Sequence, residues 1–438
     1  MSDELINESQ TSRSHVHPQA GAVHAETRAS ILVLTGHYLP GFKGGGPIRS
    51  LANLVEVLGK EFSFKVVTSD RDLGDRVPYS NIERNRWTRV GNADVMYLSA
   101  GWQGLFKLVA LLRSPVFGGV VYLNSFFSRR FSILPMVLRR LGVIHPAFVV
   151  LAPRGEFSPG ALNIRKRRKA LYRTLAKAVK AYRDVFWHAS SEAEAEDIKR
   201  FIGERRVIGI AEVIPEGRRS KTQKAFEDIA IAEDIAGSPV TSEGSRPGKL
   251  PGQLKIVFAS RISPMKNLIG AIRMLDGISG DVIFSIYGPA EDGRYWDKCL
   301  KAIAALPNNV RVHYKGMIEH DKIAQVFADN DLFLLPTLGE NYGHVICEAL
   351  SAGCPALISD QTPWRNLEER SAGWDIPLEE TNRFREVLQQ CVEGDEAWQA
   401  AHSIGARTLA AERVSSPSII EANRSLFQKA LRYATQRE

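Results

Sequence analysis

The stretch DLFLLPTLGENYGHVICEALSAGCPALISDQTPW, residues 331–364, decides the fold of this 438-residue chain. Its apolar run Leu332–Leu335 predicts a buried strand. Apolar spacing over Val345–Ala352 predicts a helix that ends at Gly353, and Ala356–Ser359 predicts a second buried strand. A strand, a loop, a helix and a strand in this order form a unit of a parallel sheet. Such sheets place their ligands at the carboxyl ends of the strands.

Two carboxylates in this stretch, Glu340 and Glu348, are eight residues apart. Glu340 precedes the predicted helix and Glu348 lies just over one turn inside it, so both can face one crevice. The helix start, near Tyr342–His344, offers backbone N–H groups that have no intrahelical acceptor. Such a helix start is a natural place for a phosphate.

Charge is unevenly distributed along the chain, although the net charge is +8. Residues 101–200 hold 18 Lys or Arg against 6 Asp or Glu, whereas residues 251–438 hold 20 against 24. The densest basic run lies within residues 165–183. This run is typical of a solvated helix face or of a surface that meets an anionic partner, either acidic lipid head groups or nucleic acid.

The sequence favours a cytoplasmic protein. We find no apolar run of the ~18 residues that a membrane span needs, and the N-terminal region has no apolar signal-peptide core. The four cysteines have no CxxC spacing and are expected to be reduced thiols; they are Cys299, Cys347, Cys354 and Cys391. A peripheral position on the inner face of a membrane is compatible with the basic run.

Composition and pattern divide the chain into five parts. Residues 1–30 are polar and aperiodic, so we expect a disordered tail. Strands and helices alternate over residues 31–215 and again over residues 253–415, which predicts two parallel-sheet domains. Residues 216–252 are expected to form a linker with an insertion. Residues 416–438 are expected to form a helix that packs across both domains.

Loops at the carboxyl ends of strands in the first domain are candidates for ligand binding. The glycine-rich segment 36–47 follows the first strand and lets backbone approach a ligand, with a flexible loop as the alternative. It is not the GxGxxG dinucleotide motif. A later loop, 152–160, carries Arg154 and Glu156. His188 ends another strand, and we interpret it as a core residue rather than a ligand.

Arg261 and Lys266 follow the first strand of the second domain, and their loop leaves the same sheet edge as the Glu340 loop. A guanidinium and an ammonium suit a diphosphate, while Glu348 can accept from two vicinal hydroxyls of a ribose and Glu340 from a sugar. Alternatively, Glu340 caps a helix and Arg261 makes a surface pair. We find no DxD-type pair in a loop that would hold a metal ion, so the sequence does not indicate a metal site.

Here the chain resembles family 4 of the retaining glycosyltransferases. Segment 336–359, PTLGENYGHVICEALSAGCPALIS, is similar to the donor-site signature of that family, in which two glutamates are separated by seven residues. Segment 259–267, ASRISPMKN, resembles its Arg and Lys element, and segment 152–162, APRGEFSPGAL, resembles its acceptor-side loop. The resemblance covers residues 31–215 and 254–435. It implies the GT-B fold, an α/β architecture of two Rossmann-like domains whose parallel sheets face an interdomain cleft.

The resemblance also implies residue roles. Arg261 and Lys266 would hold the diphosphate and Glu340 would contact the transferred sugar; these three are the implied catalytic residues. Glu348 would bind the ribose. The remaining implied donor-site residues are Gly45, Gly46, Asn341, Tyr342, Gly343, His344, Val345 and, near the base, Met317. Arg154 and Glu156 are implied on the acceptor side.

Two departures from the family pattern are visible. Many members have a histidine in the N-terminal cleft, where this chain has Arg154, and Pro-Asn-Gly at the domain crossover, where this chain has Pro215-Glu216-Gly217. The first leaves the acceptor-side catalytic group open.

The resemblance implies a retaining, metal-independent hexosyltransferase of cell-surface polysaccharide synthesis. Its donor would be a nucleotide-diphosphate sugar, its acceptor a glycan or lipid-linked molecule, and it would need no cofactor and no nucleic acid. The alternative is a GT-B protein that binds nucleotide-sugar without transferring it.

Overall fold

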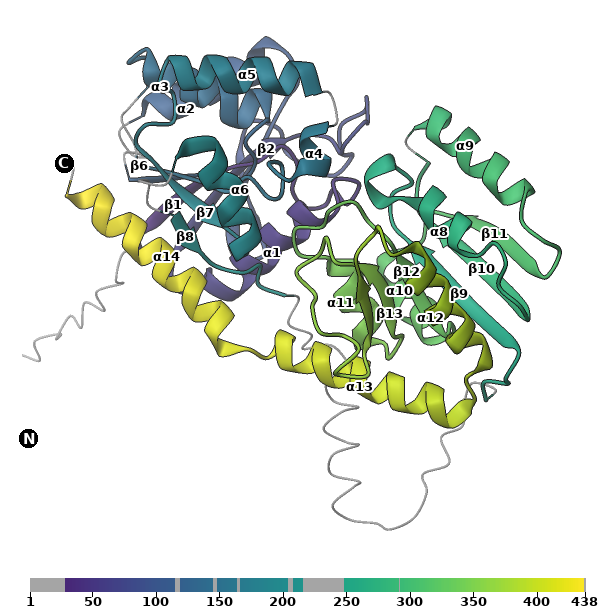
Figure 1. Cartoon of the computed structure of the whole chain (residues 1–438). Helices are drawn as coiled ribbons and strands as arrows, with labels where there is room; N and C mark the ends of the chain where they lie inside the picture. Colours follow the sequence, from purple (N-terminus) through teal and green to yellow (C-terminus); the bar gives the residue numbers. More distant parts are fainter. Residues whose placement is uncertain are drawn as a thin grey trace, which may run out of the picture.

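Two parallel-sheet domains form the described part of the chain (Figure 1). The computed structural model describes residues 28–114, 119–144, 148–163, 166–203, 208–215, 248–290 and 292–436. The expected tail up to residue 27 and the expected insertion from residue 216 to residue 247 lie outside the described residues. No helix in the described ranges is long and apolar enough to cross a bilayer.

The sheet of the first domain has eight strands within the described residues, in the order β3-β4-β2-β1-β5-β6-β7-β8. Neighbours are parallel except β3 and β4, which are antiparallel. The strands are β1 Ser30–Leu34, β2 Ser63–Ser69, β3 Trp87–Val90, β4 Ala93–Leu98, β5 Val120–Leu123, β6 Phe148–Leu151, β7 Val185–Ala189 and β8 Ile208–Ile210.

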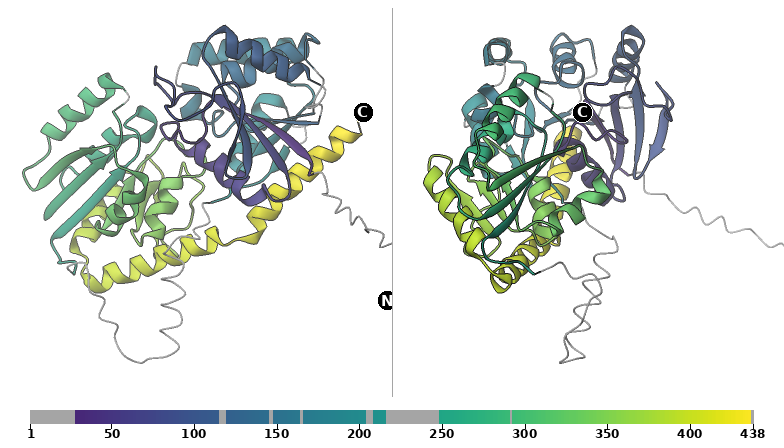
Figure 2. Two further views of the ribbon diagram at one scale, coloured as in Figure 1. Left: turned by 180° about the vertical axis from the view of Figure 1, so that it is seen from behind. Right: turned by 90° about the vertical axis from the view of Figure 1, so that its right-hand side faces the viewer.

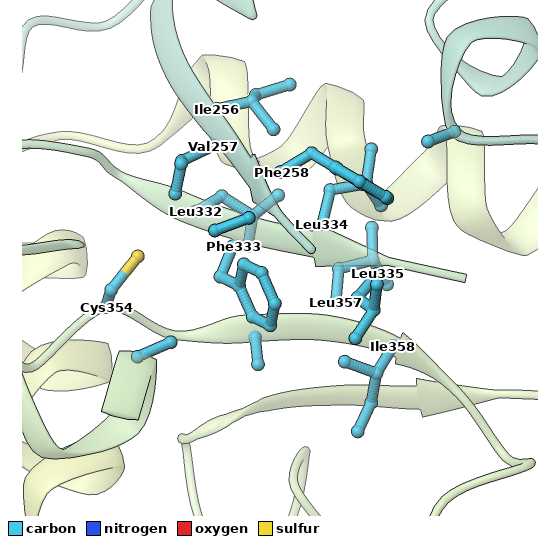
Figure 3. Close-up of a cluster of buried hydrophobic side chains, with 14 of the residues drawn as sticks. Ile256, Val257, Phe258, Leu332, Phe333, Leu334, Leu335, Cys354, Leu357 and Ile358 are labelled. Atoms are coloured by element: carbon cyan, nitrogen blue, oxygen red, sulfur yellow. The ribbon is translucent and has the colours of Figure 1, made fainter. Parts of the chain in front are cut away.

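The sheet of the second domain has six parallel strands within the described residues, in the order β11-β10-β9-β12-β13-β14. Helices cover both faces, so its central strands are continuous apolar runs, and Figure 3 shows their side chains packed together. The strands are β9 Gln253–Ala259, β10 Asp281–Tyr287, β11 Val310–Gly316, β12 Leu332–Leu335, β13 Ala356–Ser359 and β14 Gly373–Ile376.

Two helical layers cover the first sheet. One face packs against α1 (Gly46–Leu58) and α14 (Pro417–Thr435). The other face packs against helices that follow the strands in turn; these are α2 (Trp102–Arg113), the π-helix η2 (Arg129–Ile133), α3 (Leu134–Arg140), α5 (Lys166–Ala178) and α6 (Glu192–Ile202). The short helix α4 (Pro159–Asn163) precedes α5.

The helices of the second domain contribute to one core with its sheet. They are η3, a 3₁₀ turn (Pro264–Lys266), α8 (Leu268–Met274), α9 (Gly293–Ala304), α10 (His320–Ala328), α11 (His344–Ser351), α12 (Thr381–Glu393) and α13 (Glu396–Val414).

Both sheets have a topological switch point. In the first sheet β1 lies between β2 and β5, and in the second sheet β9 lies between β10 and β12. At each switch point, the connections from two adjacent strands run toward opposite edges of the sheet. The loops after these two strands therefore diverge and leave a crevice at the carboxyl edge. The glycine-rich loop follows β1, the Arg261 and Lys266 loop follows β9, and the Glu340 loop follows β12. The sheet order therefore places these three loops at the switch points, whereas Arg154 and Glu156 follow β6 and Met317 follows β11.

The strands expected over Leu332–Leu335 and Ala356–Ser359 have these bounds, and the helix expected over Val345–Ala352 is α11, His344–Ser351. Helix α6 is capped by Ser191, whose side chain accepts a hydrogen bond from the backbone N–H of Glu194. Strand β3 was not predicted, because its side chains alternate between exposed and half-buried and give no apolar run.

Helix α14 differs from its expected position. Its apolar stripe, which includes Ile419, Leu426 and Phe427, lies in the core of the first domain alone. Helix α13 packs instead against α11 of the second domain. The two helices follow one another along both domains, which Figures 1 and 2 show from several sides. The chain turns at Ser415 and Ser416, between the end of α13 and the beginning of α14. This turn lets α13 pack on the second domain and α14 on the first.

Replacing Phe427 by alanine should destabilise the first domain. The Phe427 ring is fully buried and lies 5.5–5.8 Å, centroid to centroid, from the rings of Phe62, Phe64 and Tyr122. Emptying such a site costs about 3–5 kcal/mol, so thermal unfolding should begin several degrees lower. Phe106→Ala is the control, because that ring is 69% exposed and its loss should cost less than about 0.5 kcal/mol. Equal effects of the two changes would contradict the assignment.

Candidate functional site

Hydrogen bonds join the loops after β9 and β12. The backbone N–H of Leu338 donates to the carbonyl of Met265 at 2.8 Å, and the hydroxyl of Thr337 donates to the same carbonyl at 3.0 Å. The side-chain amide of Asn267 donates to the carbonyl of Pro336 at 2.9 Å. The two loops therefore form one unit at the switch point of the second sheet.

This unit brings together Lys266 and Glu340. Their side chains form an ion pair and are 12% and 17% exposed, so solvent screens the pair only partly. The backbone N–H of Glu340 also donates to the carbonyl of Gln361, which fixes its position above β13. Arg261 is half-buried on the same loop, two residues after the end of β9.

Glu348 is held by the first domain. Its carboxylate pairs with the guanidinium of Arg49 on α1, and the Glu348 side chain is 15% exposed. Beside this pair, the Ser50 hydroxyl lies 2.9 Å from Nε2 of His344. A Cβ added to Gly46 would lie 3.4 Å from Cδ2 of His344. The beginning of α1 therefore meets the beginning of α11 across the domain interface.

Two glycines in this contact have left-handed backbone. Gly45 caps α1 with φ of 67°, and Gly343 caps α11 with φ of 80°. A Cβ on Gly343 would lie 2.7 Å from Cδ1 of Ile346, so a side chain there meets both strain and a clash. No side-chain hydrogen bond caps α11. The helix start at His344 and Val345 is therefore set by the backbone conformation of Gly343.

Aromatic side chains pack against one another at the start of α11. The Tyr342 ring is buried and lies 4.8 Å from the ring of His344 and 6.0 Å from that of Trp364, centroid to centroid. The Trp364 indole N–H donates to the Tyr342 carbonyl at 2.6 Å. The guanidinium of Arg413 lies 4.5 Å from the centroid of the Trp364 ring and pairs with Glu212 at 2.9 Å. Burial raises the pKa of Tyr342 far above its usual value.

Asn341 lies against the first domain. Its side-chain carbonyl accepts a 2.7 Å hydrogen bond from the hydroxyl of Ser190, at the end of β7. A Cβ on Gly155 would lie 3.1 Å from the Cβ of Asn341, and one on Gly160 would lie 2.8 Å from the carbonyl of Leu338. Glycine at these two positions therefore lets the loop after β6 approach the Glu340 loop.

Arg154 is held in a chain of hydrogen bonds inside the first domain. It has left-handed backbone, with φ of 56°, and donates to Asn124 at 2.9 Å and to the Tyr122 hydroxyl at 2.7 Å. The Tyr122 hydroxyl lies 2.8 Å from Nδ1 of His188, and Nε2 of His188 lies 2.9 Å from the carbonyl of Ala211. Only the neutral His188 tautomer with its proton on Nε2 completes this chain, because Ala211 can only accept and Tyr122 then donates to Nδ1.

His188 is a core residue, as predicted. It is 1% exposed, and burial, together with the positive charge of Arg154, lowers the pKa of His188 to about 3. Burial likewise raises the pKa of Tyr122 to about 12. Both groups therefore stay neutral near pH 7, and Arg154 carries the charge of this chain.

Glu156 does not join the other site residues. Its carboxylate accepts hydrogen bonds from the backbone N–H groups of Phe126 at 2.5 Å and Phe127 at 3.0 Å and from the Ser125 hydroxyl at 2.8 Å. Burial raises the pKa of this carboxyl. These donors all belong to the turn after β5, so we correct the acceptor-side expectation for Glu156: its carboxylate holds that turn.

Met317 directly follows β11, at the carboxyl edge of the second sheet, and its side chain is 59% exposed. Gly316 before it has φ of 71°, and its carbonyl accepts from Gly288 at 2.8 Å. Met317 is therefore two strands away from the Lys266 loop, since β10 lies between β9 and β11.

A cavity of about 350 Å³ lies elsewhere, on the outer layer of the first domain. It is lined by Phe157, Pro159, Leu162, Lys166, Lys169, Ala170, Arg173, Asp197 and Arg200. Over the ranges that the structure covers, no three His, Cys, Asp or Glu side chains gather as a metal site would require; metal independence stays a prediction.

Sequence reasoning missed three side chains that contact the predicted residues, namely Arg49, Ser50 and Ser190. Arg49 and Ser50 are the fourth and fifth residues of α1. Their place directly after the glycine-rich loop was the signal that could have found them. Ser190 directly follows β7, and nothing in its neighbourhood along the chain indicates a contact with Asn341.

Comparison with known proteins shows what the second domain resembles. Residues 243–396 match the family described as "Glycosyl transferases group 1". The D-inositol 3-phosphate glycosyltransferase of Nocardia farcinica (strain IFM 10152) is 25% identical over 193 residues, or 39% of this chain. The matched segment spans 43% of the length of that relative.

Solved structures with the same architecture cover nearly the whole chain. Anabaena Alr3699/HepE, solved in complex with UDP-glucose, covers 91% of this chain and 98% of its own, with a TM-score of 0.59 and 16% identity. Sucrose-phosphate synthase from Thermosynechococcus elongatus covers 92% and 99%, with a TM-score of 0.65 and 15% identity. WaaG, a glycosyltransferase involved in lipopolysaccharide biosynthesis, covers 91% and 98%, with a TM-score of 0.57 and 14% identity. The GT-B fold and the resemblance to family 4 glycosyltransferases are thus confirmed.

Stability should depend on pH through His188. The pKa of His188 is about 3 in the folded protein and 6.5 when unperturbed, so the unfolded chain binds the extra proton between these values. Stability is therefore lost as pH falls below about 6.5, by up to about 1.4 kcal/mol per pH unit for this one group.

Urea unfolding at several pH values between 4.5 and 7 measures this slope. It should be shallower in His188→Gln than in the wild type, whereas His313→Gln, at an exposed position of β11, should leave it unchanged. Equal slopes in all three proteins would contradict the neutral assignment.

Proposed function

We propose that the protein is a retaining glycosyltransferase that moves a sugar from a nucleotide-diphosphate sugar to a glycan or lipid-linked acceptor. The observation that carries the proposal is the unit formed by the loops after β9 and β12. It joins Lys266 and Glu340 in an ion pair at the switch point of the second sheet, with Arg261 on the same loop as Lys266, within the residues that match the group 1 family.

The ion pairs of this site suggest how a donor is accepted. Lys266 pairs with Glu340, and Arg49 pairs with Glu348, so each carboxylate has a cation within reach. A diphosphate competes for those cations, because it offers more negative charge and several acceptor oxygens. Both carboxylates then become acceptors for donor hydroxyls: Glu348 for the ribose and Glu340 for the transferred sugar. The charged side chains are present before binding, and donor binding changes only the groups with which they pair.

Backbone completes the proposed donor site. The start of α11, from Tyr342 to Val345, offers N–H groups to the diphosphate and the sugar. Gly45 and Gly46 approach from the first domain, and the exposed Met317 lies at the sheet edge where the base would lie. Asn341 links the donor loop to the loop after β6 through Ser190.

Catalysis would rest on position and charge. The acceptor hydroxyl attacks the anomeric carbon on the face from which the diphosphate leaves, and the leaving phosphate oxygen takes the hydroxyl proton. Arg261, Lys266 and the α11 start stabilise the charge that develops on the leaving group, without a metal ion. Arg154, fixed by Asn124 and Tyr122, is the proposed cation on the acceptor side.

Two similar proteins guide the choice of acceptor. One relative is a D-inositol 3-phosphate glycosyltransferase and another is involved in lipopolysaccharide biosynthesis. For this chain we propose a role in cell-surface polysaccharide synthesis, at the inner face of the membrane, with the basic residues 165–183 toward anionic lipid.

Loss of either cation should abolish most transfer. Arg261→Ala and Lys266→Ala each remove a group that meets leaving-group charge, so turnover should fall at least about 100-fold. Lys301→Ala, on the exposed side of α9, is the matched control and should stay within about twofold. Donors are first chosen by thermal stabilisation with a panel of nucleotide-sugars, and release of nucleoside diphosphate in the presence of a glycan acceptor is then measured. Near-normal turnover in both variants would contradict the assignment of Arg261 and Lys266 to diphosphate binding.

Glu348→Gln should separate donor binding from chemistry. The variant keeps the size of the side chain but weakens charge-assisted bonds to the ribose, so the donor KM should rise about tenfold with little change in kcat. Calorimetry with the nucleoside diphosphate should show the same loss of affinity. Nucleotide binding by the wild type with no transfer to any acceptor would favour the alternative, a binding protein of GT-B fold.

A further inference from the structure

Glu194, in the first turn of α6, is a buried carboxylate of the first domain. The residue is 5% exposed. Its carboxylate accepts hydrogen bonds from the backbone N–H of Gly155 at 2.5 Å, from the backbone N–H of Ser190 at 2.8 Å and from the Ser190 hydroxyl. A buried carboxylate costs free energy unless such donors satisfy it, and hydrogen bonds to a charged acceptor are stronger than neutral ones. Glu194 therefore holds two segments of the chain together, namely the loop after β6 and the end of β7.

These contacts exceed what a helix cap requires. Ser191 and Glu194 have the Ser-x-x-Glu spacing of a capping box, in which the glutamate carboxylate accepts from the backbone N–H of the capping serine. One half of the box forms, because the Ser191 side chain accepts from the Glu194 N–H at 3.1 Å. The carboxylate is directed instead to the N–H groups of Ser190 and of Gly155, which lies 39 residues earlier in the chain. Its partners are thus those of a residue that joins distant segments.

The segment that Glu194 holds has an unfavourable backbone conformation. Arg154 and Gly155 both lie in the left-handed region, with φ of 56° and 77°. A residue other than glycine rarely adopts this conformation and keeps it only where its surroundings hold it. The Arg154 side chain is held by Asn124 and Tyr122, and the N–H of Gly155, directly after it, is held by Glu194. The Glu194 carboxylate therefore helps to fix the position of the proposed acceptor-side cation.

A single hydroxyl connects the same carboxylate to the donor loop of the second domain. The Ser190 hydroxyl contacts the Glu194 carboxylate and, at 2.7 Å, the side-chain oxygen of Asn341, which directly follows Glu340. A Cβ on Gly155 would lie 3.1 Å from the Cβ of Asn341, so the loop after β6 also lies against this residue. Both segments that Glu194 holds therefore meet the donor loop at one residue.

We propose that Glu194 is a positioning residue for sugar transfer: it fixes the acceptor-side loop and, through Ser190, aligns that loop with the donor loop of the other domain. The inference rests on the proposed function and adds a residue to it. Transfer needs the acceptor hydroxyl and the anomeric carbon in one geometry, and a misplacement of about 1 Å can cost about 100-fold in rate. Glu194 acts through Arg154 and Asn341, so we do not count it among the catalytic residues.

Hydrogen exchange of the full chain, measured by mass spectrometry, tests the two loops without any substrate. Glu194→Gln keeps the size of the side chain but has one acceptor oxygen in place of two, so segments 153–160 and 336–345 should both exchange about tenfold faster or more. Ser190→Ala removes only the hydroxyl, so segment 336–345 should exchange faster while segment 153–160 stays as in the wild type. Glu192→Gln, at an exposed position of the same helix, is the matched control and should change neither segment.

Transfer kinetics separate positioning from donor binding. Glu194→Gln should lower kcat about tenfold or more. It should leave the Kd for a nucleoside diphosphate within about twofold, because the cations proposed to hold the diphosphate belong to the other domain. Glu192→Gln should transfer sugar as the wild type does. Asn341→Ala combined with Ser190→Ala should cost no more than Asn341→Ala alone, because both changes break the same contact.

Separate measurements keep the outcomes distinct. Circular dichroism and thermal unfolding check that each variant is folded; if Glu194→Gln unfolds the chain, Ser190→Ala and its combination with Asn341→Ala decide. Unchanged exchange of segment 336–345 in both Glu194→Gln and Ser190→Ala would overturn the proposal, as would a kcat of Glu194→Gln equal to that of Glu192→Gln. A wild type that transfers no sugar would contradict the proposed function, and exchange would still decide whether Glu194 holds the two loops together.

Discussion

The hydrogen bonds between the loops after β9 and β12 are the interaction on which the site depends. Two loops that leave adjacent strands in opposite directions would normally move independently. Here the Met265 carbonyl accepts from both Thr337 and Leu338, and Asn267 reaches the Pro336 carbonyl. Lys266 and Glu340 are consequently held at one place before any ligand arrives, which reduces the entropy lost on binding.

Charge in the site is balanced by pairs that are easy to exchange. A half-buried cation without a partner would cost free energy. A fully buried ion pair, in contrast, would not readily exchange a partner for a ligand. The Lys266 pair lies within one domain, and the Arg49 pair joins the two domains. If a donor replaces Arg49 as the partner of Glu348, as proposed above, a contact between the domains changes too, and binding would then be linked to relative domain position.

Some features of this structure could be predicted from the sequence, and others could not. The fully apolar central strands such as Leu332–Leu335 and the capped helix that starts after Ser191 were predictable, because burial on both faces and a cap leave local patterns. The convergence of Lys266 with Glu340 followed from the sheet edge they share. The carboxylate of Glu156 was misread, since its partners are backbone N–H groups 29 and 30 residues earlier. No local pattern distinguishes such a structural carboxylate from one that binds a ligand.

The place of α14 has a consequence for biosynthesis. The first domain completes its hydrophobic core with Phe427 and its neighbours, which the ribosome adds only after the whole second domain. The nascent first domain therefore exposes the part of this sheet face that α1 does not cover until the second domain has been made, although domains generally fold in the order of their synthesis. During that interval the exposed apolar surface is available to chaperones, and packing of α14 then covers it.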